Sequence, residues 1–96
     1  MSATLTRDEL ADALGRAGEG DRAAFRIVYE ATSAKLLGVC LRILADRQLA
    51  EDVLQDIYLK VAALDPSIQP DNPRAFLFRL TSNLLMDRWR SGQRAV

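Results

Sequence analysis

Four stretches of this sequence each begin at a residue that caps helices and then carry apolar residues at helical spacing. The caps are Thr6, Asp21, Asp46 and Asn72, whose side-chain oxygens can accept hydrogen bonds from the free amides of a first helical turn. Thr6 also forms a capping box with Glu9. No stretch shows the apolar and polar alternation of a strand, and the connections are short. The sequence therefore predicts an all-α fold, a compact bundle of about four helices.

Apolar residues within each predicted helix fall on one arc of about 100°, the width of a stripe that faces a protein core. The predicted helices span residues 6–17, 21–44, 46–64 and 72–90. The predicted core residues are Leu10 and Leu14 in the first helix; Phe25, Tyr29, Thr32, Leu36, Val39, Cys40 and Ile43 in the second; Leu49, Val53, Ile57, Val61 and Leu64 in the third; and Phe76, Leu77, Leu80 and Leu84 in the fourth.

The length of 96 residues predicts one domain, over residues 1–92, with residues 93–96 as the start of a polar linker. The only cysteine, Cys40, lies in an apolar run and is expected to be buried rather than reactive. Histidine is absent and no cluster has metal-ligand spacing, so neither a metal nor another cofactor is expected. No nucleophile–base pair or glycine-rich phosphate loop is visible, which argues against an enzyme and a small-molecule substrate. The lack of a signal peptide and of a long apolar run predicts a cytoplasmic protein without a membrane partner.

The formal net charge of zero conceals an asymmetry along the chain. Residues 1–70 carry 8 basic and 11 acidic side chains, a net charge of −3. Residues 71–96 carry 5 basic and 2 acidic side chains, a net charge of +3. This division predicts two partners of opposite character.

The outward face of the third predicted helix carries an acidic cluster around a leucine. Glu51, Asp52, Gln55 and Asp56 surround Leu59 on this face. An apolar centre with a polar rim is typical of a protein interface. Single exposed leucines are also common on ordinary surfaces, so the pattern alone favours the interface only modestly.

The last predicted helix has a second stripe beside its core stripe. Arg79, Asn83 and Arg90 lie on it, which offers guanidinium and amide groups to a nucleic acid, although solvated helix faces look similar. The preceding loop, residues 65–71, contains two prolines and an isolated Ile68. This isoleucine either tucks under the loop or is presented to a ligand.

The segments AEDVLQDIYLKVAAL (50–64) and FLFRLTSNLLMDRWR (76–90), with the proline-bearing loop between them, together resemble region 2 of bacterial RNA polymerase sigma factors. The resemblance is strongest to the extracytoplasmic-function (ECF) type, and the helix at residues 20–44 fits the family as well. It covers about residues 18–92. The combined pattern is specific, whereas any one motif alone is not.

The resemblance implies two binding surfaces. The family's acidic helix binds the clamp helices of the largest RNA polymerase subunit, and the matching residues here are Asp52, Gln55, Asp56 and Leu59. The family's loop and last helix capture bases of the non-template strand of the promoter −10 element and so help to melt it. The matching DNA-binding residues here are Ser67, Ile68 and Gln69 in the loop, Asn83 for base contact, Arg79, Arg88 and Arg90 for phosphates, and Trp89, with Phe78, for stacking.

Several positions depart from the family pattern. Phe76 replaces the usual tryptophan, and Ser82 replaces an arginine that often precedes the asparagine, which removes one expected phosphate contact. Asp87 matches the family pattern and is expected to be a partly buried carboxylate bonded within the bundle. A complete factor would also contain a helix-turn-helix domain for the −35 element, and the sequence after Arg90 does not encode one. The linker-like tail favours an excised domain over the alternative, a natural short form.

The leading hypothesis is thus a transcription initiation module that binds core RNA polymerase and the −10 non-template strand. The alternative is a helical protein-interaction module whose main partner is an anti-sigma regulator, without DNA readout of its own. Anti-sigma proteins of this family commonly cover the same surfaces, so the two hypotheses are partly compatible. They differ in whether the chain distinguishes between single-stranded DNA sequences.

Overall fold

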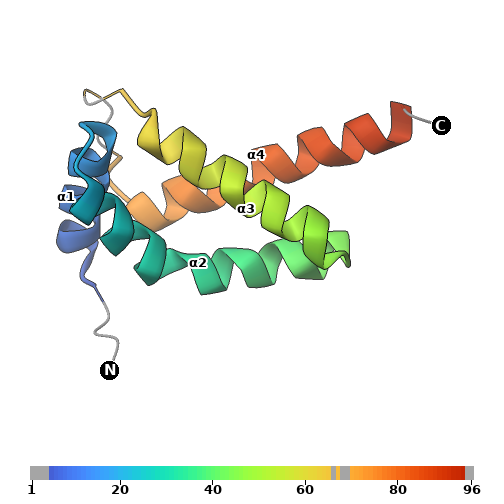
Figure 1. Ribbon diagram of the computed structural model, residues 1–96, viewed down its shortest axis with the longest axis horizontal. Coiled ribbons are helices and arrows are strands. Elements are labelled where there is room, and N and C mark those ends of the chain that lie inside the picture. Colours follow the sequence, from blue (N-terminus) through green and yellow to red (C-terminus); the bar gives the residue numbers. More distant parts are fainter. Residues whose placement is uncertain (1–4, 66, 68–69, 95–96) are drawn as a thin grey trace.

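The computed structural model describes residues 5–65, 67 and 70–94 and consists of four helices over these ranges (Figure 1). No strand occurs in the described ranges, and the predicted all-α bundle is confirmed. The helices are α1 (Arg7–Gly18), α2 (Arg22–Leu44), α3 (Arg47–Ala62) and α4 (Pro73–Arg94).

The predicted caps start all four helices. The Thr6 hydroxyl accepts a hydrogen bond from the Glu9 amide at 3.1 Å, and the Glu9 carboxylate accepts one from the Thr6 amide at 3.0 Å, which completes the capping box. The carboxylates of Asp21 and Asp46 and the amide oxygen of Asn72 each accept from the backbone amide three residues ahead, at 3.1, 3.1 and 3.2 Å. Local sequence therefore determines where each helix begins.

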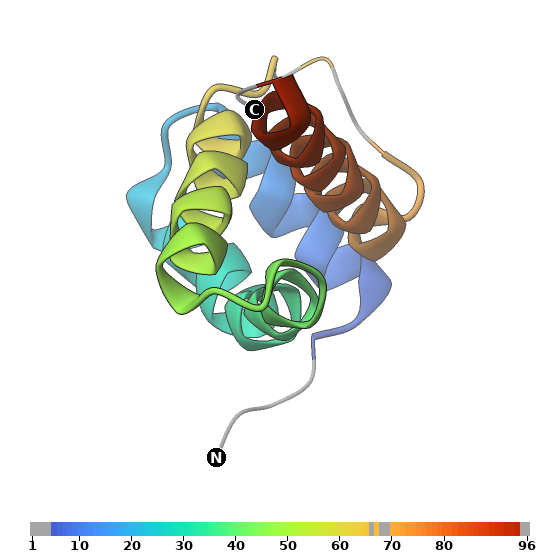
Figure 2. The same ribbon diagram turned by 90° about the vertical axis from the view of Figure 1, so that its right-hand side faces the viewer.

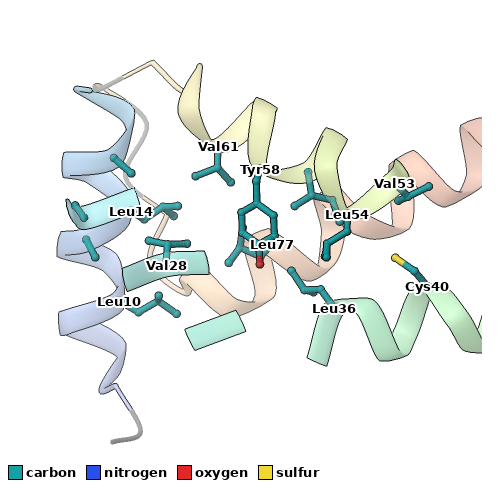
Figure 3. Close-up of a cluster of buried hydrophobic side chains, with 14 of the residues drawn as sticks. Leu10, Leu14, Val28, Leu36, Cys40, Val53, Leu54, Tyr58, Val61 and Leu77 are labelled. Atoms are coloured by element: carbon teal, nitrogen blue, oxygen red, sulfur yellow. The ribbon is translucent and has the colours of Figure 1, made fainter. Parts of the chain in front are cut away.

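The four helices enclose one core. In Figure 1, α3 runs antiparallel to α2, and α1 lies across one end of the bundle; Figure 2 shows α2, α3 and α4 around the core with α1 behind them. The end of α1 approaches the end of α3 so closely that a Cβ on Gly18 would lie 3.1 Å from the Leu64 carbonyl oxygen. Figure 3 shows the central cluster of buried side chains, among them Leu10, Leu14, Val28, Cys40, Val53, Val61 and Leu77.

The buried positions differ in part from the predicted stripes. Tyr29, Ile43 and Leu49 were predicted to be core residues and are 42%, 61% and 41% exposed. The buried residues on α2 instead recur every four residues, as do those on α4. Four residues turn by about 400°, which is about 40° more than a full turn, so a row of residues four apart is inclined to the helix axis. Helices that cross at an angle pack against each other along such inclined rows. The buried residues of these rows are Ala24, Val28, Thr32, Leu36 and Cys40 on α2, and Pro73, Leu77, Thr81 and Leu85 on α4.

Two predictions about α4 are also wrong. The helix continues to Arg94, four residues past its predicted end at Arg90, because polar residues weaken packing but still form backbone hydrogen bonds. Asp87 is exposed rather than partly buried, since it lies off the buried row that contains Leu77, Thr81 and Leu85. It therefore has no part in the core.

A buried pair of hydroxyl groups joins α2 to α3. The Thr32 hydroxyl donates to the Val28 carbonyl oxygen at 2.7 Å and lies 2.6 Å from the Tyr58 hydroxyl. Because a threonine hydroxyl has one proton, the Tyr58 hydroxyl donates to Thr32. Tyr58 points into the core cluster (Figure 3), and burial raises its pKa to about 12.

This burial predicts a loss of stability at high pH. An unfolded tyrosine ionises near pH 10, so the unfolded chain releases the Tyr58 proton before the folded chain does. The contribution of Tyr58 to stability is therefore intact below about pH 10 and falls as the pH rises toward 12. Urea unfolding at pH 9 and pH 11.5 should show a smaller decrease in the free energy of unfolding for Tyr58→Phe than for the parent. Equal decreases would contradict the prediction.

Candidate functional site

A groove between α2 and α3 is lined by part of the cluster predicted to bind a protein, whereas Asp52 and Asp56 of that cluster do not line it. Its volume is about 610 Å³, and its lining includes Leu59 and Gln55 beside aromatic side chains of α2. Leu59 is 60% exposed, so the outward leucine predicted from the sequence is accessible. Tyr29, which the sequence placed in the core, packs its ring 4.7 Å from that of Tyr58 and forms part of this groove. We call this surface the α2/α3 groove; its lining is Phe25, Tyr29, Leu37, Arg47, Glu51, Leu54, Gln55, Tyr58, Leu59 and Ala62.

The carboxylates near this groove differ in their partners. Glu51 is exposed and pairs with Arg47 of the preceding turn at 3.4 Å. Asp52 is half-buried at the surface of α3. Asp56 pairs with Arg88 of α4 at 3.2 Å, and both side chains are 41% exposed. The acidic face of α3 is thus accessible, but the carboxylates of Glu51 and Asp56 already accept hydrogen bonds from arginine side chains.

The exposed side of α4 carries the predicted DNA-binding stripe. Arg79, Asn83 and Arg90 are all exposed. They fall within a narrow arc of the helix, because residues four and seven apart return to nearly the same side. The aromatic residues Phe78 and Trp89 are 53% and 57% exposed. An amide and two guanidinium groups on one helix side can bind base edges and phosphates together.

Arg88 does not belong to this stripe. Its guanidinium turns toward α3 and bonds Asp56, so the structure separates Arg88 from Arg79 and Arg90 on α4. The two residues had been assigned to different partners, Asp56 to the polymerase and Arg88 to DNA. Only the packing of α3 against α4 brings them together. No motif in the sequence indicates this pair.

The loop before α4 is described in part. The Asp65 carboxylate accepts a hydrogen bond from the Ser67 amide at 2.9 Å, and this bond lowers the pKa of Asp65. Ser67 is exposed. Ile68 and Gln69, which were also predicted to contact DNA, lie outside the described residues. The loop leads into the Asn72 cap and therefore joins the N-terminal end of α4, the helix that carries the predicted DNA-binding stripe.

No helix among the described residues combines the length and apolar character needed to cross a lipid bilayer.

The sigma-70 region 2 family model matches residues 28–95 of this chain. The chain therefore belongs to the sigma-70 region 2 family, as its four-helix fold and the motifs on α3 and α4 indicate. It is similar to the ECF RNA polymerase sigma factor SigK of Mycobacterium ulcerans, with 32% identity over 88 residues that cover 90% of this chain and 47% of the relative. It is 34% identical to the ECF RNA polymerase sigma factor SigK of Mycolicibacterium vanbaalenii over 95 residues, which cover 95% of this chain and 47% of the relative.

These similarities identify the chain as a region 2 domain of the ECF type. It spans about half the length of the curated relatives it matches. No solved structure matches the chain significantly.

Proposed function

We propose that this domain acts in transcription initiation by binding RNA polymerase through α3 and the −10 non-template strand through α4. The observation that carries the proposal is that a sigma-70 region 2 domain presents an acidic face around an exposed Leu59 and, on the next helix, a basic stripe around an exposed Asn83. The two surfaces differ in charge and lie on different helices. They can therefore hold a basic protein surface and a nucleic acid at the same time.

The chemistry of α3 suits the basic side chains of polymerase clamp helices. Carboxylates of Asp52 and Asp56 and the amide of Gln55 can form charge-assisted hydrogen bonds with arginine or lysine side chains. Leu59 contributes apolar area at the centre of these polar contacts, where desolvation strengthens binding most. Contact with Asp56 would compete with Arg88 for the same carboxylate.

The chemistry of α4 suits a single strand of promoter DNA. The Asn83 side chain can donate to and accept from one base edge, which distinguishes bases. Arg79 and Arg90 on the same stripe bind phosphates, which adds affinity without sequence information. Promoter melting is then favoured because base contacts offset the few kcal/mol lost when a base leaves the stack.

Capture of bacterial core RNA polymerase by the immobilised domain tests the proposal directly. We expect the parent chain to retain core polymerase from a purified preparation, and an excess of isolated clamp helices to compete. Failure of a folded parent chain to retain either would refute the polymerase role. Binding to the clamp helices with no binding to single-stranded DNA would leave only the protein-interaction half of the proposal.

Substitutions on the α4 stripe should separate base readout from phosphate binding. We expect Asn83→Ala to lower the discrimination between −10 sequences by about 1–3 kcal/mol, because one bidentate base contact is lost. Arg90→Ala should weaken binding to all sequences alike and reduce the salt dependence of the affinity. Fluorescence anisotropy with matched and mismatched oligonucleotides at two salt concentrations measures both effects. Equal losses of discrimination in the two variants would contradict this assignment.

A second candidate function is the binding of an anti-sigma protein in the α2/α3 groove. The observation that favours it is the extent of apolar lining on the α2 side, where Phe25, Tyr29 and Leu37 lie beyond the acidic cluster. An apolar groove between two helices can accept the apolar face of an amphipathic helix. This candidate predicts that an anti-sigma protein and the clamp helices compete for the domain.

A further inference from the structure

A second groove follows the seam between α2 and α4, away from the α2/α3 groove. Its first hollow has a volume of about 240 Å³ and is lined by Lys35, Leu36, Val39, Arg74, Leu77 and Phe78, among others. The floor of this hollow is formed by aliphatic side chains. The two cationic side chains stand on opposite sides of it, one on each helix.

The second hollow lies farther along the same seam. Its volume is about 430 Å³, and its lining is Ile43, Leu44, Ser82, Leu85, Met86 and Trp89. The two hollows follow one another along the seam, since Val39 and Ile43 are one turn apart on α2 and Phe78 and Ser82 are one turn apart on α4. We call the pair of hollows the α2/α4 groove.

The α2/α4 groove exposes large apolar side chains that the fold does not need. Ile43, Met86 and Trp89 are 61%, 48% and 57% exposed. They form one contiguous lining rather than scattered surface residues. Contiguous exposed apolar patches of this kind mark interaction sites in soluble domains.

The charge around the groove is positive. Lys35 and Arg74 line it, and no salt bridge within the described ranges involves either side chain. The only acidic residues of α2 and α4 are Glu30 and Asp87. At about 100° per residue, both lie on the sides of their helices remote from the groove, and Glu30 pairs with Arg26 at 3.0 Å. A partner in this groove should therefore combine apolar and acidic side chains.

We propose that the α2/α4 groove binds an acidic amphipathic helix of a protein partner. The hollows are centred about eight or nine residues apart along α2 and α4, or roughly 12–14 Å, which matches apolar anchors about eight residues apart on a bound helix. Carboxylates beside these anchors would pair with Lys35 and Arg74. The buried Leu36 and Leu77 form an aliphatic floor in the first hollow, which suits a leucine-type anchor.

The proposal goes beyond the proposed function and has a structural consequence for it. Phe78 and Trp89, which were predicted to stack on bases, line the groove, so an acidic helix bound there would cover both side chains. If these side chains stack on DNA bases, the bound helix would compete with DNA while leaving the α2/α3 groove open to the polymerase. Binding of the helix itself does not depend on either function.

Trp89, the only tryptophan in the chain, reports on this groove by its fluorescence. The probe is a synthetic helical peptide with two leucines eight residues apart on one face and flanking glutamates. We expect a saturable shift of the Trp89 emission to shorter wavelength as the indole is covered. A matched peptide with lysines in place of the glutamates should bind at least about fivefold more weakly, the effect of lost surface ion pairs.

Three variants locate the site. Ile43→Glu should weaken binding of the acidic peptide by about tenfold or more, because an apolar contact is replaced by a like charge. Lys35→Glu should weaken it by up to about fivefold, and Leu59→Ala in the other groove should leave it unchanged. Ile43, Lys35 and Leu59 are exposed, so all three variants are expected to fold.

Several outcomes would overturn the proposal. They are the absence of a saturable shift with the acidic peptide, equal affinity for the lysine peptide, and unchanged affinity in Ile43→Glu. A shift produced by oligo(dT) and abolished by Ile43→Glu would also overturn it, because the groove would then be a nucleic-acid site. Capture of core polymerase is measured separately, so failure of this proposal and failure of the proposed function are distinguishable.

Discussion

Replacement of Asp52, Gln55 and Asp56 together by alanine is expected to weaken the binding of core RNA polymerase by at least about 100-fold. Hydrogen bonds to charged groups contribute roughly 1.5–3 kcal/mol each, and the three side chains share one face of α3. The loss of two such hydrogen bonds would already account for the 100-fold weaker binding, since each 1.4 kcal/mol changes the affinity tenfold. Titration of the clamp helices against the immobilised domain measures the effect.

Two controls make this result specific. The double variant Asp8→Ala, Asp12→Ala changes the net charge by the same amount but on α1. It should leave polymerase binding unchanged unless net charge alone governs the interaction. Arg88→Ala leaves the three α3 side chains in place and removes only the partner of Asp56, which separates the loss of the Asp56–Arg88 pair from the loss of polymerase contacts. The pair is exposed and should contribute no more than about 1 kcal/mol to stability. If the triple variant is folded by circular dichroism and still binds with parental affinity, α3 is not the polymerase-binding surface.

Ile57→Ala is expected to lower the free energy of unfolding by about 2–5 kcal/mol. Ile57 is fully buried on α3, and its truncation removes apolar contacts and leaves a cavity that the surrounding helices fill only in part. Small domains have total stabilities of roughly 5–15 kcal/mol, so this single change removes a large fraction of the total. The midpoint of urea unfolding, followed by far-ultraviolet circular dichroism, measures the loss.

The matched control is Ile43→Ala, the same substitution on an exposed side chain. Ile43 is 61% exposed, so its truncation should change the free energy of unfolding by no more than about 0.5 kcal/mol. The sequence predicted both isoleucines to be core residues, whereas the structure buries only Ile57. Similar losses in the two variants would show that Ile43 is covered in solution, which would contradict the exposed surface described for the α2/α4 groove.

The sequence predicted those features of the site whose residues all belong to one helix. Arg79, Asn83 and Arg90 share one side of α4 because helical spacing alone brings them together, and their exposure agrees with that spacing. The exposure of Leu59 on α3 follows in the same way. The roles of these residues in binding remain predictions. Features that join two helices had no sequence signal, as the Asp56–Arg88 pair and the aromatic lining of the α2/α3 groove show.

The sequence by itself determined the number of helices and where each one begins. These depend on hydrogen bonds between residues three or four apart, such as those from the side chains of Thr6 and Asn72 to nearby amides, so local sequence is sufficient to specify them. The tertiary structure decided which side of each helix is buried, because crossing helices pack along inclined rows that one straight stripe does not follow. Tyr29 and Ile43 are therefore exposed in grooves, while Val28 and Thr81 are in the core.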